Sequence, residues 1–182
     1  MSKKKDILDA ALKLFTENGA RATSTKSIAS EAETSEALIF KHFGSKEKLL
    51  EEIIKQGYQE ATKIISDYIN NEKGLQYILK IVEVPRILVD AHPDFWKMQH
   101  KIIALNWLSQ KHHDIFMKPC YEKLTVAFSK LNYENPVLEA ELLLIYIDGM
   151  WKHFASQQLD SKTESALTKL VQQKYKDVIS AK

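Results

Sequence analysis

Residues 23–50 read TSTKSIASEAETSEALIFKHFGSKEKLL, and this stretch decides the fold class. Ile39 and Phe43 are four positions apart, so they lie on one face of a short helix. That face can pack on Ile28 and Ala32 of the helix before it. Two short helices joined by a tight turn form a helix-turn-helix, a motif that places its second helix in the major groove of DNA.

The flanking sequence predicts further helices on both sides of this motif. Apolar residues recur at helical spacing over residues 3–18, and Gly19 suits the left-handed conformation that ends a helix. Gly44 should end the third helix, and Ser45 can cap a long helix over residues 46–70. This fourth helix itself should therefore join the head to the body, without a flexible linker between them.

We predict an all-α protein, since five glycines and four prolines leave few turns for a sheet. A three-helix head over residues 1–48 would precede a larger helical-bundle body over residues 49–182. The prolines at 93, 119 and 136 should punctuate or kink the body, because proline disfavours helix in the residue before it. The predicted body helices are 75–90, 94–109, 114–131, 137–159 and 162–180.

Charge and cysteine content narrow the function classes only slightly. The net charge is +2, and it lies in residues 1–48, which hold nine Lys/Arg and seven Asp/Glu. A single cysteine, Cys120, excludes an intramolecular disulfide and is expected to act as a small buried hydrophobe. No run of about 18 apolar residues predicts a membrane span, so we expect a cytoplasmic protein with no membrane partner.

The extended pattern over residues 5–50 resembles the DNA-binding head of the TetR family of bacterial transcriptional regulators. The similarity includes the Ile28-Ala29 pair, Ser35 at the start of the third helix, and the run FGSKEKL over residues 43–49. The resemblance implies a homodimer that binds a palindromic operator in double-stranded DNA. It also implies that the third helix contacts bases while neighbouring caps contact phosphates.

Helical geometry and this resemblance together give the candidate DNA-binding residues. At 100° per residue, Ala37 and Lys41 point away from the Ile39/Phe43 face, towards the groove. The resemblance adds Glu36 to the base-facing set and implies phosphate or sugar contacts for the others. The predicted DNA-binding residues are Thr25, Ser35, Glu36, Ala37, Phe40, Lys41, His42 and Lys46.

Three positions depart from the family pattern. Glu33 stands in the turn where the family usually has glycine, and a positive φ there would cost about 1 kcal/mol. Phe40 replaces the usual tyrosine and loses a hydroxyl donor. Glu33 and Glu36 add negative charge near the DNA, although a glutamate can also accept a hydrogen bond from cytosine N4.

The body offers a dimer interface. Residues 142–147 read LLLIYI, so the helix over 137–159 is apolar on every side and must be buried on every side. Together with the helix over 162–180 it can form a four-helix interface between two copies, as the resemblance also implies. The alternative is an ordinary monomer core.

The body also offers a candidate effector pocket, because large side chains gather between residues 95 and 154. An unknown small hydrophobic or aromatic effector could bind there; the alternative is that these side chains simply fill the core. The predicted ligand-binding residues are Trp96, His100, Trp107, Phe116, Tyr121, Tyr146, Met150, Trp151 and Phe154. We predict no metal and no cofactor, since His112, His113 and Asp114 are adjacent and fan outward from a helix.

These features predict a transcriptional regulator, a repressor, whose effector shifts the fourth helix and so changes the spacing of two heads. One alternative is a constitutive DNA-binding or protein-interaction module with no effector. Another is a small helical enzyme that uses the histidines. No Ser-His-Asp elbow, phosphate-binding glycine loop or paired carboxylate supports that alternative, so we predict that the chain is not an enzyme.

Overall fold

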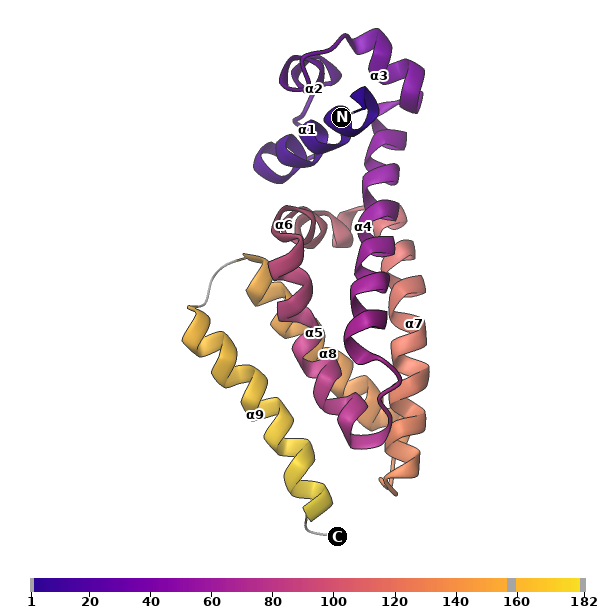
Figure 1. Cartoon of the computed structure of the whole chain (residues 1–182), viewed down its shortest axis with the longest axis vertical. Coiled ribbons are helices and arrows are strands. Elements are labelled where there is room, and N and C mark those ends of the chain that lie inside the picture. Colours follow the sequence, from indigo (N-terminus) through magenta and orange to yellow (C-terminus); the bar gives the residue numbers. More distant parts are fainter. Residues whose placement is uncertain (1, 157–159, 181–182) are drawn as a thin grey trace. The chain divides into compact units, whose positions relative to one another are not determined.

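The structure, a computed structural model, describes residues 2–156 and 160–180, and the side chains only as far as residue 177. Over these ranges the chain forms α-helices and one 3₁₀ helix, with no strand, which confirms the predicted all-α class (Figure 1). The helices are α1 Lys3–Asn18, α2 Thr25–Glu31, α3 Glu36–Phe43, α4 Lys46–Ile69, α5 Gly74–Ala91, α6 Pro93–Ile102, η1 Ile103–Leu105, α7 Trp107–Lys130, α8 Pro136–Ser156 and α9 Ser161–Ser180.

Short polar side chains cap the starts of helices α2 and α3. Ser24 and Ser27 form a reciprocal capping box at the start of α2, and Ser35 accepts a hydrogen bond from Leu38 N at the start of α3. Helix α1 ends at Gly19, whose φ of 83° is a conformation that glycine adopts without strain. These local signals explain why the boundaries of α1, α2 and α3 follow from the sequence.

The chain divides into two compact units, each described here by itself. The head unit comprises the residues up to Glu60 together with His92–His113, and the body unit comprises Ala61–Ala91 and Asp114–Lys182. The head unit thus holds α6, η1 and the start of α7 in addition to the helix-turn-helix. The predicted division after residue 48 follows the order of the sequence, whereas the compact units combine segments that are distant in the sequence.

Helix α6 joins the head unit through direct bonds to α1. The hydroxyl of Thr16, buried near the end of α1, donates to the carbonyl of Asp94 at 3.0 Å. Lys101 Nζ in turn donates to the carbonyl of Thr16 at 2.7 Å. The carbonyl of Thr16, in the last turn of α1, therefore has a cationic partner on α6.

A buried polar network links α4, α6 and α7 inside the head unit. Gln99 Nε2 donates to Tyr58 Oη at 2.6 Å, and Ser109 Oγ donates to Gln99 Oε1 at 2.8 Å. Tyr58 Oη lies 3.3 Å from His113 Nδ1. Because buried polar groups are costly unless they are paired, this network fixes how the three helices meet.

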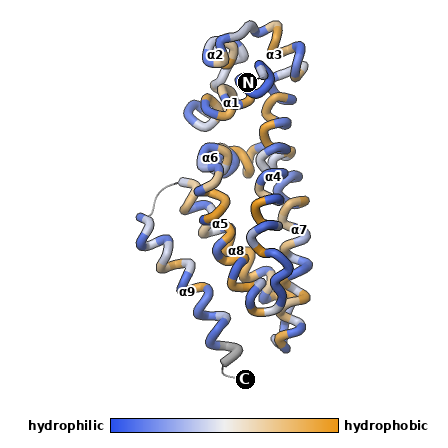
Figure 2. Tube along the Cα trace, viewed as in Figure 1, coloured by the Kyte–Doolittle hydropathy of each residue, from blue (hydrophilic) through white to orange (hydrophobic). Residues whose placement is uncertain are grey.

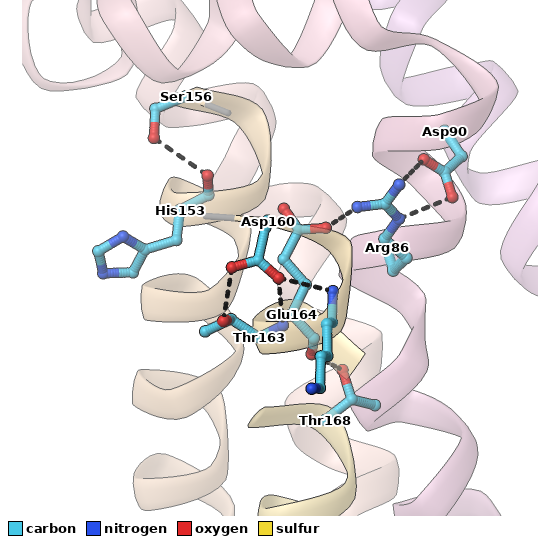
Figure 3. A network of polar contacts seen from close by, with 9 residues as sticks. Arg86, Asp90, His153, Ser156, Asp160, Thr163, Glu164 and Thr168 are labelled. Carbon is cyan, nitrogen blue, oxygen red and sulfur yellow. Dashed lines mark hydrogen bonds and ion pairs between the residues drawn. The ribbon is translucent and has the colours of Figure 1, made fainter. Parts of the chain in front are cut away.

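In the body unit α5 packs against both α8 and α9. Apolar residues, orange in Figure 2, recur along α5. Three of them, Ile78, Val82 and Leu88, are completely buried. Ion pairs add to this packing. The guanidinium of Arg86 on α5 binds Asp90 and also the buried carboxylate of Glu164 on α9 (Figure 3). Both an apolar face and an ion pair therefore hold α9 on α5.

The predicted boundaries fail at the centre of the chain. The helix predicted over 94–109 is divided, because Asn106 is extended and its Oδ1 accepts from Leu108 N and Ser109 N, which starts α7. Helix α7 then runs through Pro119 without a break, although a helix was predicted to begin only at residue 114. Residues 157–159, predicted as the end of the helix from 137, lie outside the described residues.

None of the described helices has the length and apolar character to cross a membrane.

Candidate nucleic-acid interface

Helices α2 and α3 pack through the apolar face that the spacing predicts. Ile28 and Ile39 are completely buried, and Phe43 and Ala32 are nearly so. Thr34 N donates to the carbonyl of Ala29 at 2.9 Å, which closes the turn between the two helices. The pair is therefore held as a rigid helix-turn-helix with one apolar and one exposed side.

Glu33 in this turn adopts a φ of 48°. The turn thus keeps the left-handed conformation that favours glycine, and Glu33 bears the strain of about 1 kcal/mol that the sequence predicts for a positive φ. The side chain of Glu33 is exposed. Glu33 therefore occupies a left-handed turn position at a cost in stability.

The exposed side of α3 holds a mixed surface of one small, one aromatic and two potentially cationic side chains. Ala37, Lys41 and His42 are exposed, and Phe40 is 47% exposed although it is large and apolar. The small side chain of Ala37 lets the backbone approach a partner closely, and Lys41 provides a flexible cation. Contact of this surface with a DNA groove stays a prediction.

Two of the predicted DNA-binding residues bind each other. Thr25 Oγ1, in the first turn of α2, donates a hydrogen bond of 2.5 Å to Glu36 Oε2, in the first turn of α3. Both residues are partly buried. Ser35, next to Glu36, is occupied as the cap of α3. The hydroxyls of Thr25 and Ser35 are therefore already engaged within the protein.

Lys46 is also engaged within the protein. Its Nζ donates to the carbonyls of Ala20 and Thr23, at 2.8 Å each. The side chain thus ties the first turn of α4 to the loop between α1 and α2. A phosphate contact by Lys46 stays a prediction, and the structure adds a role in holding that loop.

Lys26 is an exposed cation that the sequence-based set omits. It lies beside Thr25 in the first turn of α2. A basic residue next to a capped helix start is a usable signal for phosphate binding, because phosphate contacts dominate affinity for DNA. We add Lys26 to the candidate interface on this ground.

The predicted ligand-binding residues fall in both units. Trp96, His100 and Trp107 belong to the head unit, and the other six belong to the body unit. Trp107 is 75% exposed, with Lys111 Nζ 5.9 Å from its ring centre, and so differs from the buried wall predicted for it. Trp107 is the first residue of α7, directly after Asn106, whose Oδ1 accepts a hydrogen bond from Leu108 N.

The predicted ligand-binding residues in the body unit differ in how deeply their side chains are buried. Met150, Trp151 and Phe154 on α8 are buried, and the rings of Phe116 and Trp151 lie 6.1 Å apart. Tyr121 is partly buried. Tyr146 is 36% exposed, at the edge of the buried face of α8 that holds Leu143 and Met150. The first group can contribute to an internal pocket, whereas Tyr146 belongs to an outer surface.

The Cys120 thiol is not activated as a nucleophile. Burial raises the pKa of the Cys120 thiol to about 11, so the thiol is protonated at neutral pH. Among the described residues, no three His, Cys, Asp or Glu side chains are placed to hold a metal ion together.

Sequence comparison matches the helix-turn-helix to a known family. A family model described as bacterial regulatory proteins of the tetR family matches residues 7–53. YvkB of Bacillus subtilis, an HTH-type transcriptional regulator, is 50% identical over 52 residues, which are 29% of this chain and 28% of YvkB. The HTH-type transcriptional repressor Rv3405c of Mycobacterium tuberculosis is 36% identical over 92 residues, 48% of this chain and 47% of the repressor. The matched segments thus span less than half of these relatives.

Structural comparison extends the likeness to the whole chain. The fatty acid degradation regulator FadR of Bacillus halodurans superposes with a TM-score of 0.74, covering 95% of this chain and 94% of FadR, at 17% identity. At this identity the comparison shows a shared fold. The helix-turn-helix segment of the chain thus matches the tetR family of bacterial regulatory proteins, and the chain shares its fold with regulators of known structure.

Proposed function

We propose that the chain is a DNA-binding transcriptional regulator that acts as a homodimer. The observation that carries the proposal is the exposed face of α3, where Ala37, Lys41 and the half-exposed Phe40 project from a helix whose other face is buried. In a helix-turn-helix this second helix enters the major groove, and its outward side chains contact base edges.

The homodimer is supported by an apolar surface on α8 and α9. Leu143 and Ile147 of α8 are buried within the subunit, whereas the apolar residues on the other side of the helix are not. The exposed apolar residues of these two helices are Val137, Leu138, Ile145, Tyr146 and Leu170. A surface of this kind is stable in water when a partner covers it.

Charge complementarity makes a second copy of the chain the fitting partner. Helix α8 carries three acidic residues and one lysine, a balance of −2. Helix α9 carries four lysines and two acidic residues, a balance of +2. A two-fold axis that places α8 of one subunit beside α9 of the other would pair opposite charges around the apolar centre.

The dimer sets the geometry of DNA binding. Two recognition helices that meet successive major grooves lie about 34–36 Å apart and require a palindromic site. We propose that a small apolar or aromatic effector in the body unit changes this spacing through α4, which only two residues separate from the end of α3. Regulation by such a ligand would make the protein a repressor that releases its operator.

Selection from a pool of random duplexes tests the function. The effector-free protein should enrich a palindrome whose half-sites are one helical turn or a multiple of it apart. Enrichment of no sequence at low salt would exclude a sequence-specific regulator.

Native mass spectrometry and tryptophan fluorescence test the effector. The Trp107→Phe variant removes the exposed tryptophan, so the remaining signal comes from Trp96 and Trp151, which are buried. A bound small molecule that changes this signal and lowers operator affinity is the expected result. Operator binding that no copurified or added apolar ligand alters would favour a constitutive DNA-binding protein.

A further inference from the structure

We infer that Glu36 is a specificity filter: its carboxylate competes with DNA phosphate for Thr25 and favours operators that present a cytosine to it. The inference rests on the proposed DNA-binding function and concerns the same surface. It starts from the 2.5 Å hydrogen bond between Thr25 Oγ1 and Glu36 Oε2, which joins the first turns of α2 and α3.

Because of this bond, the Glu36 carboxylate and a DNA phosphate compete for the same hydroxyl proton of Thr25. A threonine hydroxyl has one proton to donate, and in this structure that proton goes to the Glu36 carboxylate. A phosphate oxygen that approached Thr25 would have to replace an oxygen of like charge. Contact with the phosphate backbone therefore requires the Thr25–Glu36 bond to break, whatever the sequence of the DNA.

The Glu36 carboxylate also has no basic partner on this surface among the described residues. Its described hydrogen-bond partner is the neutral hydroxyl of Thr25, and within the described part of the chain no lysine or arginine pairs with it. The neighbouring Ala37 and Phe40 carry no charge that would offset it. A negative group that faces a polyanion lowers affinity for every sequence, and the cost is greatest where no donor meets it.

One class of operator relieves this cost. Cytosine presents its N4 amino group in the major groove, and a glutamate is a suitable acceptor for it. At such a site Glu36 exchanges the Thr25 hydroxyl for the amino group, and the hydroxyl is free for a phosphate. On DNA without a cytosine at this position, either the Thr25 hydroxyl or the Glu36 carboxylate lacks a partner. Glu36 therefore increases the difference in affinity between operator and non-operator DNA.

The first test compares the wild type with Glu36→Gln on the selected operator and on a random duplex, over a series of salt concentrations. Glutamine keeps the length of the side chain and removes its charge. We expect the random duplex to bind about tenfold more tightly, and the ratio of operator to random affinity to fall by about tenfold. Glu51→Gln, a change of the same charge at an exposed position on α4, is the matched control and should leave the ratio unchanged.

The second test is a double-mutant cycle between Glu36→Ala and Thr25→Val, measured on the random duplex. Valine preserves the shape of threonine without the hydroxyl. In the wild-type background Thr25→Val should change affinity by less than twofold, because the hydroxyl is bound to Glu36. In the Glu36→Ala background the hydroxyl is free for phosphate, and the same change should weaken binding severalfold.

Several outcomes would overturn the inference. If the wild type selects an operator but Glu36→Gln leaves the affinity ratio unchanged, the filter is wrong and the proposed function stands. Additive effects in the cycle would exclude competition for Thr25. The base pair that Glu36 contacts is the one at which the Glu36→Gln variant loses its preference. If that base pair has no cytosine on the contacted strand, the base assignment is wrong. Failure of the wild type to prefer any duplex would remove the function and the filter together.

Discussion

Gly57 of α4 lies against the ring of Phe95 of α6, so closely that a Cβ atom on Gly57 would come within 2.1 Å of Phe95 Cε2. The position is in the middle of a helix, where glycine is less favourable than alanine by about 1 kcal/mol. The close approach of α4 and α6 is the physical reason for glycine here. Both helices at this contact belong to the head unit.

Gly57→Ala should therefore destabilise the protein despite its better helix propensity. The methyl group must displace the Phe95 ring, and we expect a net loss of about 1–3 kcal/mol in the free energy of unfolding. Denaturant unfolding measures this. Gln59→Ala, an exposed change on the same helix, is the control and should shift stability by less than about 0.5 kcal/mol. Gly57→Ala with Phe95→Leu should recover part of the loss, and unchanged stability of Gly57→Ala alone would contradict the contact.

Glu33→Gly should stabilise the protein. Glu33 is in a left-handed conformation that glycine adopts without strain, and the hydrogen bond from Lys3 Nζ goes to its backbone carbonyl, which glycine retains. We expect a gain of about 1 kcal/mol and a higher melting temperature. Glu31→Gly, inside α2 and without a positive φ, should instead destabilise. A loss of stability in Glu33→Gly would show that the turn does not hold Glu33 under strain.

The helix-turn-helix could be predicted from the sequence because its signals are local. The four-residue spacing of Ile39 and Phe43 determines a face, and Ser24, Ser35 and Gly19 determine the ends of helices next to them. The positions of Lys46 and Glu36 depend on partners 26 and 11 residues away, which no local pattern encodes. The break before α7 was missed because the cap, Asn106, lies in a stretch of otherwise helix-forming residues.

Ile145→Glu should separate the homodimer without unfolding the subunit. Ile145 is 64% exposed on α8, so a charge there meets water in the monomer and an apolar surface in the dimer. Sedimentation should show a dimer of the 21.0 kDa chain for the wild type and a monomer for the variant. Val126→Glu, at an exposed site on α7, is the control and should remain dimeric. Leu143→Glu is unsuitable because Leu143 is completely buried and its change would unfold the subunit.

Lys46→Met tests whether Lys46 holds the loop or binds a phosphate. The ammonium donates to two carbonyls, so its loss should lower stability by about 2 kcal/mol. If the loop is its role, operator affinity falls and the dependence of affinity on salt keeps its slope. A phosphate contact would instead reduce the slope by about one per subunit. Lys26→Met, at an exposed cation, should reduce that slope with no loss of stability.

The central claim is that α3 determines sequence preference, and Lys41 tests it most directly because it is exposed on the face opposite Ile39 and Phe43. The measurement is the affinity of the wild type and of Lys41→Ala for the selected operator and for each of its single-base-pair variants. We predict that Lys41→Ala loses about 1–3 kcal/mol on the operator and loses its preference at one base pair in each half-site, while the other positions keep theirs. Equal weakening at every position, or a wild type that prefers no duplex at low salt, would contradict the account.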